Sequence, residues 1–228
     1  MASGTGERTA PQGPTAGFVL LIGSLTLLPA MSIDMYLPSL PEVAAELGAS
    51  TAAAQVTITG MMLGGAVGQL VIGPFSDRVG RRLPVLLGVS LHGLLSLLCA
   101  IAPTIGLLIA LRGLQGFAAA GATVVALAMI RDRFVGAEAS HLMSRLALVI
   151  GVAPLFAPAV GTVVAQHWSW RGVFVVLAAL AAVLLVVVAI VLPETLPPER
   201  RARVAVPALA RGYVMLLRDG RFLALAVL

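Results

Sequence analysis

The sequence has no lysine, a single cysteine and little charge, since only 11% of its 228 residues are charged. A soluble domain usually carries about 25% charged residues, so this scarcity excludes an ordinary soluble fold. The lone Cys99 excludes a disulfide framework within the chain. A glycine-rich phosphate loop, a Ser-His-Asp set and a cluster of metal ligands are also missing from the sequence, which argues against an ATP-driven pump. We therefore expect no enzyme, no metal and no cofactor.

Long apolar stretches take the place of the missing charge, because 59% of the residues are hydrophobic. The hydrocarbon core of a bilayer is about 30 Å thick and takes about 20 helical residues to cross. The stretches lack the two-residue alternation of barrel strands, so they predict an all-α integral membrane protein with six spanning helices. The predicted spans are Phe18–Leu37, Val56–Phe75, Leu83–Ala102, Ile105–Met129, Leu146–Ala165 and Val173–Leu192.

The rest of the chain divides around these spans. Residues 1–17 form a polar tail, 18–192 the six-helix transmembrane domain, and 193–221 a linker that begins with several prolines. The last seven residues, FLALAVL (222–228), are apolar but too few to span a bilayer. We therefore expect the chain to be cut at the start of a seventh helix.

The basic residues are all arginine, and they gather on one side of the predicted topology. Thirteen of the fifteen lie in the tail, in the loops after the second and fourth spans, or after the sixth span. Arg171 lies on the opposite side and Arg112 within a span. The positive-inside rule places the arginine-rich segments, and with them the N-terminus, in the cytoplasm. The net charge of +5 therefore reflects membrane topology, and we expect no nucleic-acid partner.

Two formal charges fall within the predicted spans: Asp34 in the first and Arg112 in the fourth. An intramembrane charge usually faces a partner or a watery cavity, because exposure to lipid costs several kcal/mol. Both residues lie in the same half of the membrane, so we expect them to share a cavity. The alternatives are an interfacial cap for Asp34 and a structural ion pair or carbonyl clamp for Arg112.

Other polar residues have less specific interpretations. His92, in the middle of the third span, has no acidic partner at helical spacing, which favours a hydrogen bond to another helix. Glu42 and Glu46 follow the first span and are expected on the solvated face of an external loop.

The segment GPFSDRVGRR joins the second and third spans. Gly73 is expected to allow a close approach of the second helix to a neighbour, and Gly80 a tight turn. Asp77 is expected at the N-terminus of the third helix, where the helix dipole favours an anion. Arg81 and Arg82 supply donors for carboxylates or lipid phosphates.

Glycine and proline also have a pattern within the spans. Gly60, Gly64 and Gly68 form a small-residue ladder that predicts tight helix packing. In RGLQG, Arg112 and Gln115 are one turn apart and can face one cavity. In GVAPLFAPAVG each proline removes an N–H and invites a kink, so a bent helix with a small-residue face is predicted; the residues are Gly151, Pro154, Pro158 and Gly161.

Together these pieces resemble the major facilitator superfamily, and specifically its twelve-helix drug:proton antiporters of the Bcr/CflA branch. DMYLPSLP is similar to that branch's first-helix motif, GPFSDRVGRR fits motif A, and RGLQG fits motif B. APAVG after Gly151 resembles the antiporter motif C, with Thr162 where a second closing glycine is usual. PETL after the sixth span also suits the branch.

The resemblance implies roles for matching residues. Asp34 and Arg112 would take part in proton and substrate coupling, with Gln115 supporting Arg112. The motif of the fifth predicted span, called the helix-5 motif below, would form an interface with the other half of the transporter; its residues are Gly151, Pro154, Pro158 and Gly161. A cytoplasmic latch would be formed by Gly73, Asp77, Arg78, Gly80, Arg81 and Arg82. Two departures matter: no acid precedes Asp34 in the first span, and the C-terminal six helices are absent.

The sequence thus predicts a multi-pass plasma-membrane protein that exports small amphipathic compounds or drugs in exchange for protons. Its partners would be the substrate, protons, the lipid bilayer and the missing C-terminal half. The alternatives are a superfamily transporter of a metabolite or nutrient, a membrane scaffold or sensor without transport, and a membrane enzyme.

Overall fold

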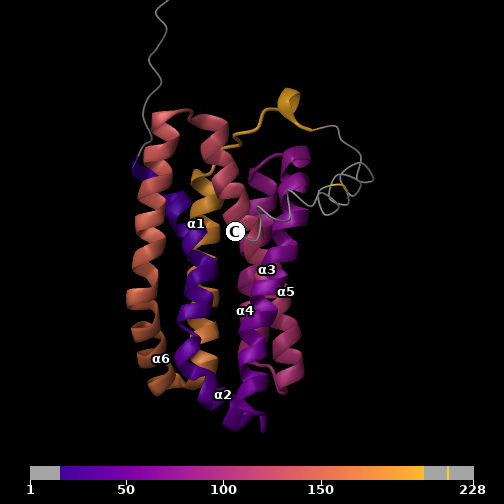
Figure 1. Cartoon of the computed structure of the whole chain (residues 1–228), viewed down its shortest axis with the longest axis vertical. Helices are drawn as coiled ribbons and strands as arrows, with labels where there is room; N and C mark the ends of the chain where they lie inside the picture. Colours follow the sequence, from indigo (N-terminus) through magenta and orange to yellow (C-terminus); the bar gives the residue numbers. More distant parts are fainter. Residues whose placement is uncertain (1–15, 203–214, 216–228) are drawn as a thin grey trace, which may run out of the picture.

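Every regular element in the described part of the chain is a helix (Figure 1). The computed structural model describes residues 16–202 and Met215, so the predicted tail (1–17), the linker (193–221) and the start of a further helix (222–228) fall wholly or largely outside it. The elements are α1 (Ala16–Asp34), η1 (Leu37–Ser39), α2 (Leu40–Glu46), α3 (Thr51–Val79), α4 (Arg82–Ala100), α5 (Ile105–Arg133), α6 (Ala137–Val191) and η2 (Pro198–Arg200).

Helix α6 is a hairpin of two arms. Its backbone leaves the helical region at Trp168 and at Ser169, where φ is +63°, and Figure 1 shows the two arms running side by side from a turn at the end of the bundle that carries α2. Five helices of the described chain are long and apolar enough to cross a membrane. Since α6 contributes two arms, the described chain has six such segments, and the predicted all-α six-helix bundle is confirmed.

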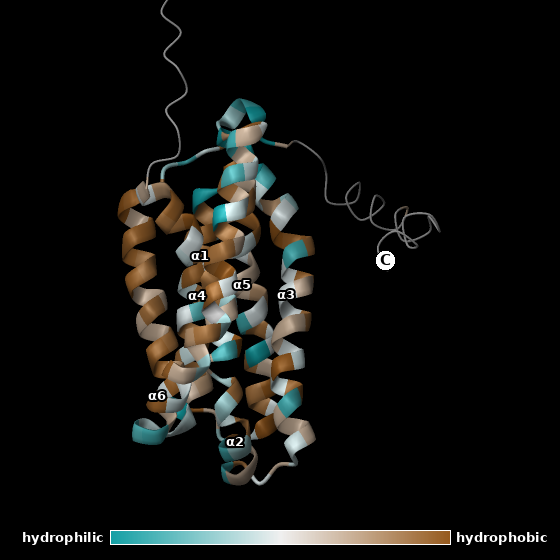
Figure 2. Cartoon of the chain, turned by 60° about the vertical axis from the view of Figure 1, so that its left-hand side comes forward, coloured by the Kyte–Doolittle hydropathy of each residue, from teal (hydrophilic) through white to brown (hydrophobic). Residues whose placement is uncertain are grey.

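The two ends of the bundle are distinct. We call the end that carries α2 the α2 end, and the end at which α3 runs into α4 through Arg81 and Arg82 the arginine-rich end (Figure 1). Figure 2 shows α6 almost wholly hydrophobic, with hydrophilic residues at both ends of the bundle. Large apolar side chains such as Leu148, Leu155 and Ile190 are exposed, as expected of a surface that meets lipid.

Glycines bring α3 against α5. A Cβ at Gly64 would overlap the carbonyl of Gly113, and one at Gly68 would come within 2.7 Å of the Phe117 carbonyl oxygen. The tight packing predicted from the glycine ladder is therefore confirmed. Gly73 differs: a Cβ there would meet only the Val124 side chain, at 3.6 Å, so the close approach predicted at Gly73 is wrong.

Helix α1 ends earlier than its predicted span. It stops at Asp34, and the chain turns through η1 into α2, each of which begins with a proline in its first turn. Asp34 is therefore the last residue of α1, not a residue three positions inside it. Glu42 and Glu46 lie on the short helix α2, not on a loop.

Candidate functional site

A connected set of buried polar groups lies between α1, α4 and α5. The Arg112 guanidinium donates through Nη1 to Oε1 of Gln115 at 2.6 Å and through Nη2 to the carbonyl oxygen of Ser32 at 3.1 Å. Gln115 Nε2 donates to Ser96 Oγ at 2.7 Å, and that hydroxyl donates to the His92 carbonyl oxygen at 2.8 Å. All five side chains are fully buried. We call these five residues the Arg112 network.

His92 links the network to α1. Its Nε2 lies 3.0 Å from Ser32 Oγ, and its Nδ1 lies 3.4 Å from the Gln115 carbonyl oxygen. The Ser32 hydroxyl also donates to the Leu28 carbonyl at 2.8 Å, so Ser32 ties the His92 ring to α1. The interhelical hydrogen bond predicted for His92 is therefore confirmed.

The end of α1 makes the Ser32 carbonyl available to Arg112. In a continuing helix this oxygen would accept the N–H of Tyr36, but that N–H bonds to the Ile33 carbonyl at 3.2 Å instead. Carbonyls at a helix C-terminus lack backbone donors and carry partial negative charge, and an arginine satisfies both conditions. Arg112 of α5 therefore caps the C-terminus of α1.

Arg112 is held without a carboxylate. None of the ion pairs among the described residues includes it. Its Cζ lies 4.9 Å from the centre of the Tyr36 ring and 5.5 Å from that of Phe174, and a desolvated cation–π contact stabilises by about 2 kcal/mol. Its Nε is buried without a hydrogen-bond partner. The guanidinium is thus a buried positive charge, offset by oxygens and ring faces.

Asp34 does not meet Arg112. Its side chain is partly exposed and makes no hydrogen bond or ion pair with any described residue. The two side chains therefore do not bond to each other, and the cavity expected between them stays a prediction. What connects the two charges is the backbone: Ser32, whose carbonyl Arg112 holds, precedes Asp34 by two residues.

A second polar cluster closes the arginine-rich end. Arg81 is buried and donates to Asp132 Oδ2 at 2.8 Å, to Asp77 Oδ1 at 2.6 Å and to Ser76 Oγ at 2.7 Å. Burial by itself disfavours the charged guanidinium, but the two carboxylates outweigh it, so the pKa of Arg81 lies above its ordinary value. Arg81 thereby fixes the end of α3 to the end of α5.

Glu194, which follows the end of α6, binds the backbone of the same cluster. Its carboxylate accepts the backbone N–H groups of Arg81, Arg82, Thr195 and Leu196 at 2.8–3.3 Å. Burial raises the pKa of Glu194, but the four donors outweigh it and hold that pKa below its usual range. Its contribution to stability is therefore present at neutral pH, and it is lost only as the pH falls through that lowered pKa.

The acid at the N-terminus of α4 is thus Glu194, and the prediction that Asp77 would occupy that position is wrong. Asp77 lies in the last turn of α3, where the dipole disfavours an anion, and its charge is offset by Arg81. Sequence reasoning missed Glu194 and Asp132 as cluster residues. The PETL segment could have drawn attention to Glu194, but the neighbouring sequence did not indicate which backbone amides its carboxylate binds.

The remaining motif A residues differ in their contacts. Gly80 turns the chain between α3 and α4 with φ of +102°, as predicted. Arg82 Nη2 donates to the Ala189 carbonyl at 2.6 Å. The Arg78 side chain, partly exposed in the last turn of α3, makes no hydrogen bond or ion pair with the described residues.

The helix-5 motif lies on the first arm of α6. A Cβ at Gly161 would overlap the Met35 carbonyl, so this glycine lets α6 pack against the end of α1. A Cβ at Gly151 would meet nothing within 4 Å. Gly151 and Pro154 are exposed, while Pro158 is partly buried. The motif therefore has a buried end at Gly161 and an open end at Gly151.

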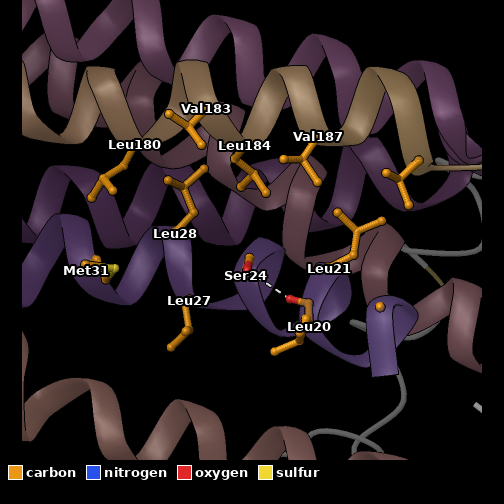
Figure 3. Close-up of a pocket in the computed structure, with 12 residues that line it drawn as sticks. Leu20, Leu21, Ser24, Leu27, Leu28, Met31, Leu180, Val183, Leu184 and Val187 are labelled. Carbon is orange, nitrogen blue, oxygen red and sulfur yellow. Dashed lines mark hydrogen bonds between the residues drawn. The ribbon is translucent and has the colours of Figure 1, made fainter. Parts of the chain in front are cut away.

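An apolar groove lies apart from both clusters, between α1 and the second arm of α6 (Figure 3). It measures about 460 Å³ and is lined almost entirely by leucine and valine. Ser24 is its one hydroxyl, and that hydroxyl donates to the Leu20 carbonyl at 2.9 Å. The groove presents no free polar group for recognition and resembles the rest of the lipid-facing surface.

Comparisons with known proteins agree with the motifs. The sequence matches the Major Facilitator Superfamily over residues 22–228. It is 39% identical to the uncharacterized MFS-type transporter YdgK of Bacillus subtilis, covering 91% of this chain and 52% of that protein. It is 36% identical to a bicyclomycin resistance protein homolog of Haemophilus influenzae, with the same coverage. It is 32% identical to the multidrug resistance protein MdtL of Salmonella heidelberg, covering 82% and 47%.

A solved structure has the same fold. The crystal structure of the human organic anion transporter MFSD10 (TETRAN) superposes with a TM-score of 0.68 at 21% identity, covering 87% of this chain and 53% of that one. The chain therefore spans about half the length of the relatives that it matches.

The turn at Gly80 gives a test of the arginine-rich cluster. A Cβ at Gly80 would collide with the Glu194 carboxylate and Arg201, whereas one at Gly48, also at positive φ, would meet nothing within 4 Å. Gly48→Ala should cost about 1–2 kcal/mol of stability from backbone strain alone. Gly80→Ala should cost about 2 kcal/mol more, since it also breaks charge-assisted bonds. Thermal unfolding of the purified protein measures both, and equal losses would contradict the role given to Glu194.

Proposed function

The chain belongs to the Major Facilitator Superfamily, and we propose that it is the N-terminal half of a transporter that exports small amphipathic compounds in exchange for protons. The observation that carries this proposal is the arrangement around Arg112. A buried cation holds the backbone of α1 two residues before a carboxylate that has no hydrogen-bond or ion-pair partner among the described residues. A proton on that carboxylate and the position of α1 can therefore be linked.

The linkage works through charge. Ionised Asp34 follows by two residues the Ser32 carbonyl that Arg112 holds, and its charge attracts the guanidinium across the partly exposed end of α1, more weakly than two buried charges in contact would attract. A proton on Asp34 removes that attraction, and the capping bond to Ser32 then holds α1 alone. Proton uptake and release would thereby change how firmly the end of α1 is held against α5. In alternating access such a change opens the pathway to one side or the other.

The cluster at the arginine-rich end fits the cytoplasmic side of the membrane. We place the arginine-rich end in the cytoplasm of a plasma-membrane protein, because arginines favour the cytoplasmic side. Gly73, Asp77, Arg78, Gly80, Arg81 and Arg82 would then serve the cytoplasmic latch, with Glu194 and Asp132 as its anchors. The open end of the helix-5 motif, from Gly151 to Pro158, would face the other half of the transporter.

Export of drugs is supported by the names of two relatives, a bicyclomycin resistance protein homolog and the multidrug resistance protein MdtL. Import or export of a metabolite is the main alternative, and a scaffold or sensor without transport is the other. Proteoliposomes of the full-length protein separate them, with ethidium and bicyclomycin as probes and an imposed pH gradient. Uncoupler-sensitive movement of either probe supports the proposal, and a protein that moves neither contradicts it.

The orientation can be tested by cysteine labelling. Ala45 on α2 and Glu199 on η2 are exposed at opposite ends of the bundle. A membrane-impermeant maleimide on intact cells should label Ala45→Cys and leave Glu199→Cys unlabelled until the cells are opened. The reverse pattern would overturn the topology, and the buried Cys99 is removed beforehand by Cys99→Ser.

Asp34→Asn keeps the shape of the side chain but removes its charge. In the full-length protein we expect it to abolish probe movement driven by the pH gradient, because no proton is exchanged at this position. Membrane insertion should be unchanged, since removing a charge eases insertion, and Asp34→Glu should retain part of the activity. Glu42→Gln, which removes an exposed acid nearby, is the control. Full gradient-driven export by Asp34→Asn would place the proton site elsewhere.

Arg112→Lys preserves charge but not geometry. Lysine has one nitrogen, so it cannot repeat the fork that joins Ser32 and Gln115, and it stacks poorly between two rings. Losing one charge-assisted hydrogen bond costs about 1.5–3 kcal/mol, so transport should fall about ten- to a hundredfold. Arg200→Lys, at an exposed position on η2, is the matched control. Equal transport by both variants would show that positive charge alone suffices at Arg112.

A further inference from the structure

Three residues join α2, α4 and α6 at the α2 end. Glu46, the last residue of α2, accepts Trp170 Nε1–H at 2.6 Å on one carboxylate oxygen, and Arg171 Nε and Nη2 at 3.1 and 2.9 Å on the other. Arg171 Nη1 also donates to the carbonyls of Ala100 and Ala102, at 2.9 and 3.1 Å. We call Glu46, Trp170 and Arg171 the α2–α6 clamp. Glu46 is exposed, as expected of a solvated face, but the sequence did not predict these bonds.

The clamp is more than a surface ion pair. The Glu46 and Arg171 side chains are 43% and 31% exposed, and an exposed pair by itself contributes little. The same carboxylate, however, binds the indole of Trp170, which is fully buried. Arg171 in turn satisfies carbonyls at the C-terminus of α4 and stacks on Trp170 with its Cζ 4.3 Å from a ring centre. One carboxylate therefore fixes two neighbouring residues just after the turn of α6.

Ring contacts continue from the clamp to Arg112. Trp170 meets Phe174, one helical turn later, edge to face at 6.0 Å. Phe174 packs on Tyr36 with ring centres 5.2 Å apart, and both rings cover the Arg112 guanidinium. The position of Phe174 over Arg112 thus depends on where the clamp holds the start of the second arm of α6.

We propose that Glu46, Trp170 and Arg171 are positioning residues that hold Phe174 over Arg112 and keep water out of the bundle at the α2 end. Release of the clamp would let the turn of α6 move away from α2, uncover the guanidinium and admit water to the Arg112 network. In the proposed transport cycle, on which this role rests, the clamp closes the outer side. The clamp itself can be tested without transport.

Cys99 is a native reporter of that closure. It is fully buried and belongs to the same apolar cluster as Trp170 and Phe174, and it directly precedes Ala100, whose carbonyl Arg171 holds. A thiol in this position reacts with a water-soluble maleimide only when the cluster opens. The reaction is measured on the full-length protein in lipid nanodiscs, with Cys99→Ser subtracted as the background.

Glu42 and Glu46 provide a matched pair for the experiment. Both are acids on α2, one turn apart, but Glu42 makes no hydrogen bond or ion pair with the described residues. We expect Glu46→Gln to raise the rate of Cys99 modification about tenfold, which corresponds to about 1.4 kcal/mol, and Glu42→Gln to leave it unchanged. Trp170→Phe, which keeps a ring but loses the N–H, should also raise it. The double variant should react no faster than the faster single variant, because both changes break the same bond.

A transport measurement then shows whether the clamp positions Phe174 over Arg112 or only stabilises the fold. Where the wild-type protein moves ethidium or bicyclomycin, Glu46→Gln should shift the pH of half-maximal exchange and Glu42→Gln should not, at equal protein amounts and melting temperatures. Equal Cys99 rates in the two variants would overturn the proposal whatever the transport result. A wild-type protein without transport, but with the expected Cys99 rates, would instead refute the proposed function and leave the closing role of the clamp standing.

Discussion

The interior of this bundle depends on the protein groups that stabilise the buried Arg112 guanidinium in place of water. Arg112 receives an amide oxygen from its own helix and a backbone carbonyl from α1. The carbonyl is free only because α1 ends two residues later, so that Tyr36 N–H bonds elsewhere. The end of α1 therefore supplies one of the oxygens that stabilise the buried charge of Arg112. Without an adjacent acid, the guanidinium stays responsive to any negative charge that approaches.

The same principle operates at both ends of α4. Glu194 accepts amides at its N-terminus, and Arg171 donates to carbonyls at its C-terminus. Each charge has the sign that the helix dipole favours, and each comes from a segment distant in sequence. Glycine contacts such as Gly64 against Gly113 fix α3 on α5. Small residues therefore allow the sides of α3 and α5 to pack closely, while charged residues distant in sequence stabilise the ends of α4.

The sequence predicted what is local. Hydrophobic runs gave six crossing segments, the glycine ladder gave tight packing, and Gly80 gave the turn. It could not predict partners separated by a hundred residues or more, so the bonds of Glu46 to Trp170 and Arg171 were missed and Asp77 was expected where Glu194 lies. Charge and similar depth led to the expectation that Asp34 and Arg112 share a cavity, but they could not show whether the two side chains touch. Depth alone does not decide which way a side chain points, and the early end of α1 leaves Asp34 partly exposed.

The strengths of these contacts differ in a way that suits alternating access. Apart from the buried Arg81, the charged groups at the two ends of the bundle are at least partly exposed, so water can replace most of the bonds that separation breaks and opening costs little free energy. The Arg112 network is fully buried, and breaking one of its bonds would leave a polar group unsatisfied at a cost of about 1–3 kcal/mol. Separating the helices should therefore cost less free energy at the two ends of the bundle than around the Arg112 network. The last turn of α1 joins the two kinds of surroundings, because it carries both the buried Ser32, whose carbonyl Arg112 holds, and the partly exposed carboxylate of Asp34.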